Sequence, residues 1–151
     1  MTADLMEQIR HYCAYRERCH SEVRRKLYDL SFSGADLEEV IGTLIEEGFL
    51  NEERFARSYC RGKFGMKRWG KRKIIDHLKQ KQVSEYCIRK GMEEINDKDY
   101  ERVFQDAFRK KWRSLSTEKN YWIKKKKTRD YLLGKGFEPE LIYEQLKNAD
   151  E

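Results

Sequence analysis

Three stretches of this 151-residue chain repeat one apolar pattern, and this repeat limits the folds that the chain can adopt. Each stretch has a leucine, then an apolar residue five positions later, and another after five more. A last apolar position follows four residues further on. The leucines are 51 and 54 residues apart, which indicates a unit of about 50 residues. The equivalent sets are Leu27, Leu78 and Leu132, then Phe32, Val83 and Phe137, then Leu37, Ile88 and Ile142, and finally Ile41, Met92 and Leu146.

Each unit is expected to contain three helices. Apolar residues recur every three or four positions, as on one face of a helix, and no stretch alternates with the period of two that is typical of a strand. Residues that favour helix starts precede these faces: Ser21, Ser33, Asn51 and Ser84 as N-caps, and Pro139 at a first helical position.

The sequence therefore predicts an all-α fold of three tandem three-helix repeats, at residues 1–50, 51–96 and 97–151. One repeat has little apolar surface to bury, so we expect the repeats to stack into an elongated, curved array.

The composition is compatible with this fold. Charged residues make up 40% of the chain, which alone would favour disorder, but 13% of the residues are aromatic and the apolar pattern is regular. No apolar run is as long as the roughly 18 residues of a membrane span. The first residues lack the features of a signal peptide. We expect a cytoplasmic monomer without a membrane partner.

Charge is distributed unevenly along the chain. Residues 36–53 contain seven acids and no Lys or Arg. Residues 61–90 contain eleven basic residues and two acids, and residues 109–135 have the same counts. The two basic segments predict a basic surface, which favours a polyanion and most often nucleic acid.

The first basic segment contains three glycines, Gly62, Gly65 and Gly70, which would let the backbone approach another surface closely. We expect a basic loop that leads into a basic helix. Trp69 has two interpretations: it stacks on a base of a nucleic acid, or it packs against Ile74 at a helix start. The candidate contacts are Arg61, Lys63, Lys67, Arg68, Trp69, Lys71 and Arg72.

The second basic segment contains four consecutive lysines, Lys124, Lys125, Lys126 and Lys127, followed by Arg129. Successive helical residues turn by about 100°, so four lysines surround the helix and some must extend along its apolar side. Like charges at this spacing destabilise a helix, and a polyanionic partner would relieve the repulsion. These five residues are therefore candidate binding residues, with a solvated helix face as the alternative.

Catalysis is not expected. The sequence has no phosphate-binding loop and no nucleophile motif. The four cysteines form no C-x-x-C pair, and the three histidines lack partners at metal-ligand spacing. We predict no catalytic residue, metal or cofactor.

Several segments resemble the RecX family of bacterial recombination regulators. They are residues 21–27 (SEVRRKL), 48–59 (GFLNEERFARSY), 70–78 (GKRKIIDHL) and 135–137 (KGF). The similarity covers nearly the whole chain and implies tandem three-helix repeats. The family often has glycine four positions after each repeat's leucine, immediately before the next apolar residue of the pattern. Here Ser31 and Gln82 take that place in the first two repeats, and Gly136 keeps it in the third.

The resemblance implies a function. Family members bind the RecA recombinase filament in its groove and mostly inhibit its ATPase, strand-exchange and coprotease activities. Some also bind DNA, so weak binding to single- and double-stranded DNA is expected. Two alternatives remain: a plain nucleic-acid-binding helical module without a recombinase target, and a scaffold whose acidic segment, residues 36–53, meets basic surfaces.

Overall fold

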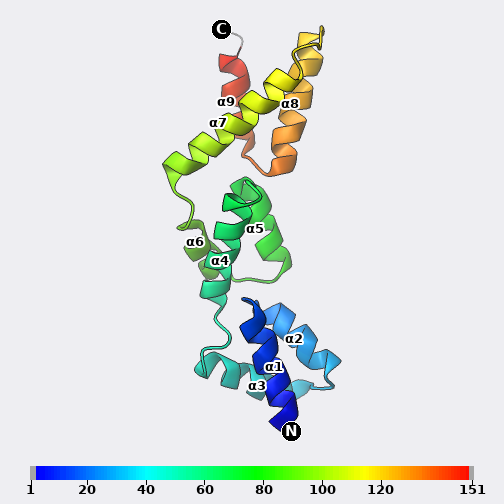
Figure 1. Cartoon of the computed structure of the whole chain (residues 1–151), viewed down its shortest axis with the longest axis vertical. Coiled ribbons are helices and arrows are strands. Elements are labelled where there is room, and N and C mark those ends of the chain that lie inside the picture. Colours follow the sequence, from blue (N-terminus) through cyan, green and yellow to red (C-terminus); the bar gives the residue numbers. More distant parts are fainter. Residues whose placement is uncertain (1–2, 150–151) are drawn as a thin grey trace. The chain divides into compact units, whose positions relative to one another are not determined.

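The structure is a computed structural model that describes residues 3–149. Within that range it contains nine α-helices and no strand, which confirms the all-α prediction (Figure 1). The helices are α1 (Ala3–Tyr15), α2 (His20–Asp29), α3 (Gly34–Glu46), α4 (Glu52–Gly65), α5 (Lys71–Gln80), α6 (Glu85–Met92), α7 (Asp97–Ser114), α8 (Tyr121–Lys135) and α9 (Pro139–Asn148).

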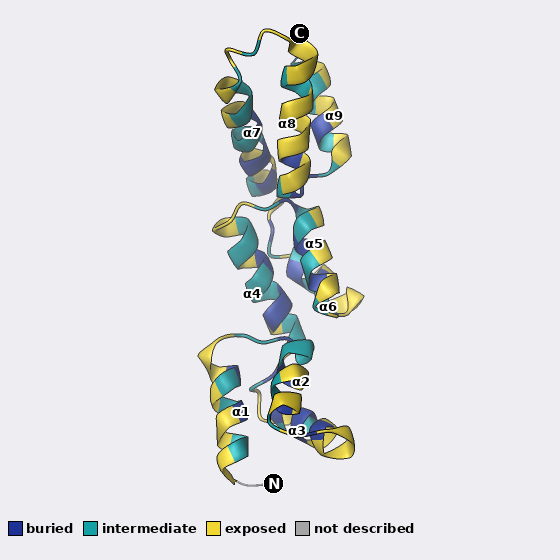
Figure 2. Ribbon diagram, turned by 90° about the vertical axis from the view of Figure 1, so that its right-hand side faces the viewer, coloured by how far each residue is buried: buried dark blue, intermediate teal, exposed yellow. Residues whose placement is uncertain are grey.

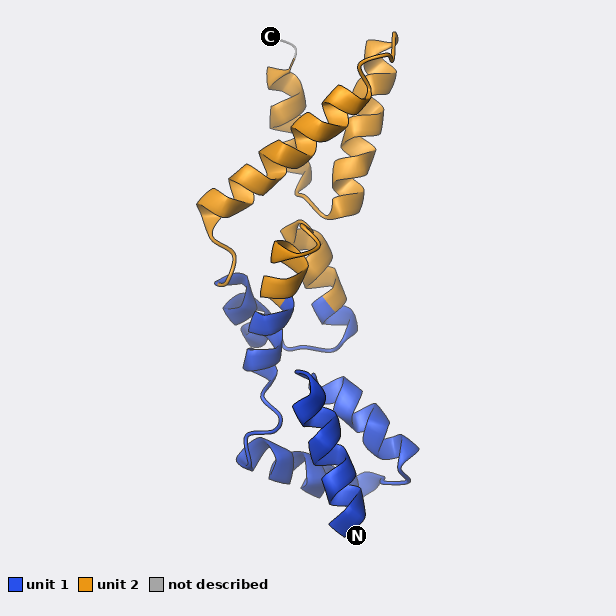
Figure 3. Ribbon diagram, in the orientation of Figure 1, with its two compact units in different colours: residues 1–59, 78–93 blue, residues 60–77, 94–151 orange. Residues whose placement is uncertain are grey.

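The chain divides into two compact units (Figure 3). Unit 1 comprises residues 1–59 and 78–93, and unit 2 comprises residues 60–77 and 94–151. Two of the three divisions fall inside α4 and α5, so each of these helices contributes residues to both units, and the third lies between α6 and α7. All twelve candidate binding residues belong to unit 2.

Each unit has an apolar core (Figure 2). In unit 1 the buried cluster is built from α1, α2 and α3 and includes Ile9, Leu27 and Leu44. In unit 2 the fully buried rings of Phe104 and Phe137 meet edge to face, with centroids 5.2 Å apart. Ten of the twelve repeat positions named above are buried, and the other two, Met92 and Leu146, are half-buried.

The end of the second helix of each repeat has the same geometry in all three copies. The backbone N–H of the later apolar residue donates to the carbonyl of the repeat's leucine: Phe32 to Leu27 at 3.0 Å, Val83 to Leu78 at 3.1 Å, and Phe137 to Leu132 at 3.1 Å. The residue before each donor has left-handed φ: Ser31 at 72°, Gln82 at 64° and Gly136 at 98°. This is a glycine-type helix end that two of the three repeats form without glycine.

Replacing Ser31 or Gln82 with glycine should therefore raise stability. A side chain in left-handed geometry costs about 1 kcal/mol or more, and the greater flexibility of glycine in the unfolded chain offsets part of the gain. We expect a net gain of about 0.5–1 kcal/mol for each change, or about 2 °C in melting temperature. Gln82→Ala is the control, because it keeps the Cβ atom and should give no increase. An equal effect of glycine and alanine would contradict this account.

The predicted helix starts were mostly correct. The Asn51 side chain accepts from the Arg54 N–H at 2.9 Å, and the Ser84 hydroxyl accepts from the Cys87 N–H at 3.2 Å. Pro139 is the first residue of α9, as predicted. Ser33 lies at the N-cap of α3, but its side chain makes no capping hydrogen bond.

The prediction that Ser21 caps α2 was wrong. The N-cap is Cys19, whose N–H donates to the Glu22 carboxylate at 3.0 Å. Ser21 lies inside the first turn, where its hydroxyl donates to the carbonyl of Lys81 at 2.7 Å. The sequence does not show that the Ser21 hydroxyl has a partner 60 residues away, and that partner decides its role.

Candidate nucleic-acid interface

The candidate binding residues form two groups in unit 2. One group follows the end of α4, the loop 66–70 and the start of α5, and the other lies in the first half of α8. The C-terminal end of α8 contacts the loop, and Lys126 lies ten residues before Gly136. At 1.5 Å per residue this is about 15 Å along the helix. The second group therefore lies about 15 Å along α8 from the end of that helix that contacts the loop.

The loop 66–70 is held by a backbone contact with the end of α8. From the sequence we expected a close backbone approach at the glycines, but not its partner. The Gly70 N–H donates to the carbonyl of Lys135 at 2.7 Å, and the Arg72 N–H donates to that of Gly136 at 3.0 Å. A Cβ atom on Gly70 would lie 2.3 Å from the carbonyl carbon of Gly136. Gly70 thus allows the close backbone approach that was expected of a glycine, but it approaches Gly136 of the same chain and not a partner. We call this contact between residues 70–73 and 135–137 the glycine clamp.

Three cations project from the clamped loop and helix start. Lys67 and Arg68 lie in the loop, Arg72 lies in the first turn of α5, and all three are exposed. In the part of the chain that the structure describes, none of the three side chains forms an ion pair. We call these residues the loop cluster. They are the candidate residues best able to bind an anion without first breaking an internal contact.

Positive side chains at the N-terminus of α5 are unfavourable for the stability of this helix. The first turn carries Lys71, Arg72 and Lys73 and no acid, although the N-terminus of a helix is its positive end. The amides of Lys71 and Arg72 already donate to the Tyr100 hydroxyl at 3.0 Å and to Gly136. An anion at this place would therefore be bound by side chains, because two of the first amides are occupied.

Two further cations that the sequence analysis did not select lie beside the loop cluster. The Lys135 ammonium donates to the carbonyl of Lys67 at 3.0 Å. Its pKa is lowered, first because partial burial disfavours the charged form and then because the Lys73 ammonium is close. The negative charge of a bound phosphate would oppose this shift by favouring the charged form of Lys135. Both lysines belong to the two basic segments, so the charge counts contained this signal.

The Trp69 ring is engaged within the protein. It is half-buried, and its centroid lies 4.7 Å from that of the His77 ring. The ammonium groups of Lys63 and Lys73 lie 4.9 and 4.4 Å from the Trp69 ring centroid. This arrangement favours the structural interpretation of Trp69, with His77 and the two lysines as its recorded partners. It also gives Lys63 a role in packing.

Two other candidates of the first group have acidic partners. Arg61 forms an ion pair with Glu94 at 2.5 Å. The Lys71 ammonium lies 3.8 Å from the Asp97 carboxylate and 4.6 Å from the Tyr100 ring centroid. Binding a polyanion through either side chain would compete with these contacts. Arg61 and Lys71 are therefore weaker candidates for anion binding than the loop cluster.

The lysine run in α8 surrounds the helix as predicted. The Lys124 ammonium lies 4.1 Å from the Trp112 ring centroid, and that of Lys125 lies 4.9 Å from the Tyr121 ring centroid. These two lysines are half-buried, whereas Lys126 and Lys127 are exposed. The expectation that some lysines extend along the apolar side is confirmed.

The outer cations of α8 have local acidic partners. Lys127 pairs with Glu118 at 3.4 Å, and the Asp130 carboxylate lies 3.9 Å from the Lys126 ammonium and 3.4 Å from the Arg129 guanidinium. All these side chains are substantially exposed except that of Glu118. Exposed pairs contribute little to stability, so a polyanion can displace them at low cost.

The comparisons with known proteins support the repeat. Residues 51–92 match the model of the second three-helix domain of RecX, and residues 99–146 match that of the third. A regulatory protein RecX of Chlorobium phaeobacteroides is 30% identical over 131 residues, which cover 87% of this chain and 83% of the relative. The chain belongs to the RecX family. Its members among the relatives are named as regulatory proteins, so a regulatory role follows from the family.

Other RecX proteins are similar to this chain in sequence and in structure. The relative from Thermotoga petrophila is 29% identical over 90% of this chain and 78% of its own length. A crystal structure of RecX from Lactobacillus salivarius has a TM-score of 0.83 and 24% identity, and the match covers 99% of both chains. This structural likeness establishes the RecX fold for the chain.

Three further observations concern the described residues. None of the helices between residues 3 and 149 is both long and apolar enough to cross a membrane. The same range holds no group of three or more His, Cys, Asp or Glu side chains placed to bind a metal ion. The buried Cys60 thiol has its pKa raised to about 12, first by burial and then by the charge of Glu94, so it is a poor nucleophile at neutral pH.

Proposed function

We propose that this RecX family protein regulates a RecA-type recombinase by binding its filament on DNA, and that it carries out no chemistry itself. It would act as a cytoplasmic monomer without a cofactor, built from three-helix domains at residues 1–50, 51–96 and 97–151. The regulatory role follows from the family, and the resemblance of the sequence names the recombinase. Binding would inhibit ATP hydrolysis, strand exchange and coprotease activity.

The structural observation that supports the DNA contact in this proposal is the loop cluster, and the family resemblance is what points to a recombinase filament. Lys67, Arg68 and Arg72 are exposed, lack acidic partners among residues 3–149, and extend from a loop fixed by the glycine clamp. The clamp fixes the backbone that carries these cations, so binding phosphate has to order their side chains but not the loop. Lys126 and Lys127, which lie about 15 Å along α8 from the Gly136 side of the clamp, offer a second contact. Two linked contacts bind more tightly than either alone when their spacing fits the target.

The loop cluster alone is equally compatible with a plain nucleic-acid-binding module, which remains the second candidate. The scaffold alternative has less support, because several acids of residues 36–53 are engaged within unit 1. Glu38 pairs with Arg24, and Glu47 pairs with Arg10 at 3.1 Å. These acids are therefore less available to bind a basic partner.

The test is the ATPase rate of the cognate recombinase on single-stranded DNA, measured with sub-stoichiometric additions of this protein. We expect the rate to fall and the protein to co-sediment with the filament. The variant Lys67→Gln/Arg68→Gln/Arg72→Gln should have a weaker effect than its matched control Arg25→Gln/Arg89→Gln/Lys98→Gln, which removes the same charge from other exposed positions. An unchanged rate without co-sedimentation would leave only the nucleic-acid-binding module.

A further inference from the structure

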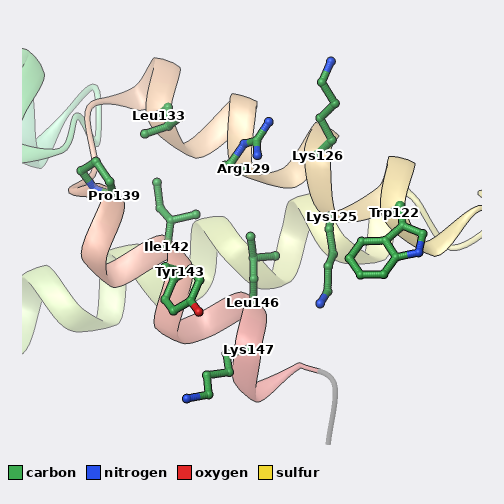
Figure 4. A pocket seen from close by; sticks show the side chains of 10 residues that line it. All are labelled: Trp122, Lys125, Lys126, Arg129, Leu133, Pro139, Ile142, Tyr143, Leu146 and Lys147. Carbon is green, nitrogen blue, oxygen red and sulfur yellow. The ribbon is translucent and has the colours of Figure 1, made fainter.

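A groove between α8 and α9 is not used by the loop cluster (Figure 4). It encloses about 540 Å³, within the range of pockets that hold a ligand or a few side chains. Its apolar lining includes Leu133, Pro139, Ile142 and Leu146. Ile142 is buried, Leu133 is 39% exposed, and Tyr143 at the edge is 68% exposed. The groove thus presents apolar surface that the described part of unit 2 leaves uncovered.

The ionisable groups that line this groove, the Tyr143 phenol apart, are all cations. They are Lys125, Lys126, Arg129 and Lys147, and no acid is among the lining residues. The Asp130 carboxylate beside the groove pairs with two of these cations, Lys126 and Arg129, as described above. An apolar floor with a cationic rim is complementary to a ligand that has apolar anchors and acidic flanks.

The aliphatic floor favours a peptide over a nucleic acid as the occupant. Bases stack on aromatic faces, and the exposed rings of Trp122 and Tyr143 lie at the edge of the groove, where the Lys125 ammonium lies 5.4 Å from the Trp122 ring centroid. The floor is aliphatic and offers bulky side chains a place to bury rather than a ring to stack on. A groove between two helices also matches the way in which an amphipathic helix docks through residues spaced three or four apart.

We propose that the α8–α9 groove binds a short acidic segment of a partner protein, which inserts bulky apolar side chains between the helices. Its acidic residues pair with Arg129 and Lys147 at the rim of the groove. This proposal deepens the proposed function, because it gives the chemistry of a protein contact distinct from the DNA contact at the loop cluster. It does not require that the partner be a recombinase.

The experiment is selection from a random peptide library displayed on phage, with peptides of roughly 12 residues, enough for three helical turns. The full chain is the bait, and peptides that also bind the Arg129→Glu/Tyr143→Ala variant are removed. Both positions are exposed, so this variant should fold, and its melting temperature checks that it does. We expect selected peptides to combine Asp or Glu with Leu, Phe, Met or Trp.

The selected peptide is then measured by fluorescence anisotropy. Arg129→Glu and Tyr143→Ala should each weaken its binding about tenfold or more, because hot-spot residues cost more than about 1.4 kcal/mol when removed. Asp130→Asn should tighten binding about two- to threefold, since it frees two cations of the rim. Tyr28→Ala, an exposed tyrosine of unit 1, is the control and should leave the affinity unchanged.

Three outcomes would overturn the proposal. The first is a selection that yields no acidic, apolar consensus or one that does not depend on the groove. The second is oligo(dT) binding that the groove variants abolish, which would assign the groove to nucleic acid. The third is self-association in analytical ultracentrifugation that Arg129→Glu abolishes, which would make a second copy the occupant. If the wild-type protein binds the peptide but does not regulate the recombinase, the proposed function is refuted and the groove proposal is not.

Discussion

Replacing Gly136 with alanine is expected to lower the free energy of unfolding by about 3–5 kcal/mol. An alanine Cβ would lie 2.3 Å from the Lys73 Cβ and 2.7 Å from the Lys73 backbone nitrogen, and neither atom can move without moving α5. The φ of 98° adds strain for any residue with a side chain. Overpacking costs roughly 1–3 kcal/mol, and a residue in a sparsely populated backbone region costs a similar amount.

Chemical denaturation followed by circular dichroism measures this effect. Gly134→Ala is the matched control, because Gly134 lies two residues earlier inside α8 and an added Cβ meets no atom within 4 Å. Alanine there should stabilise the protein by about 0.5–1 kcal/mol, since it favours the helix. Gly70→Ala should resemble Gly136→Ala, because it closes the same gap from the other side. Equal stability of the Gly136 and Gly134 variants would show that the glycine clamp does not hold the loop.

The repeat could be predicted from sequence because its determinants are local. The helix end of each repeat needs a leucine, a left-handed residue and a buried apolar residue within six positions. Phe32, Val83 and Phe137 are buried as those positions require. Ser31 and Gln82 adopt left-handed φ so that Phe32 and Val83 can donate the hydrogen bond that Phe137 donates after Gly136, where glycine adopts this φ easily. Here the burial of the apolar residue outweighs the preference of the turn for glycine.

Contacts between distant segments could not be predicted in the same way. The sequence shows that Gly70 and Gly136 are glycines, but not that their backbones meet 66 residues apart. Glu52 is a second example: its carboxylate accepts from the His20 N–H at 3.1 Å and from the Ser84 N–H at 3.4 Å. The sequence shows Glu52 only as the residue that follows the N-cap Asn51. Tertiary packing decides which amide groups it reaches.

The candidate site was predictable as a charge surplus but not as a geometry. Counting charges located both basic segments, and helical spacing predicted that the lysine run would surround α8. Which cations remain available depends on long-range ion pairs, such as that between Arg61 and Glu94. Lys73 and Lys135 were missed because the clamp that brings them together is itself a long-range contact.

Neutralising the loop cluster should weaken binding to single-stranded DNA about 100-fold. We expect about five phosphate contacts in the wild type, three from Lys67, Arg68 and Arg72 and two from Lys126 and Lys127. Each contact with a single strand contributes about −0.7 to the slope of log affinity against log salt concentration. The wild-type slope should be near −3.5, and that of Lys67→Gln/Arg68→Gln/Arg72→Gln near −1.4. At about 0.1 M salt this difference in slope corresponds to about two orders of magnitude in affinity.

Fluorescence anisotropy of labelled oligo(dT) across a salt series gives both the affinity and the slope. The control triple variant Arg25→Gln/Arg89→Gln/Lys98→Gln has the same net charge and should keep a slope near that of the wild type, because its positions lie on other elements. An equal loss in both variants would mean that DNA responds only to the net charge of the protein. A specific loss in the first variant, with an unchanged melting temperature, would assign the phosphate contacts to the clamped loop. The effect of the same variant on the recombinase ATPase then tells whether this contact is also used on the filament.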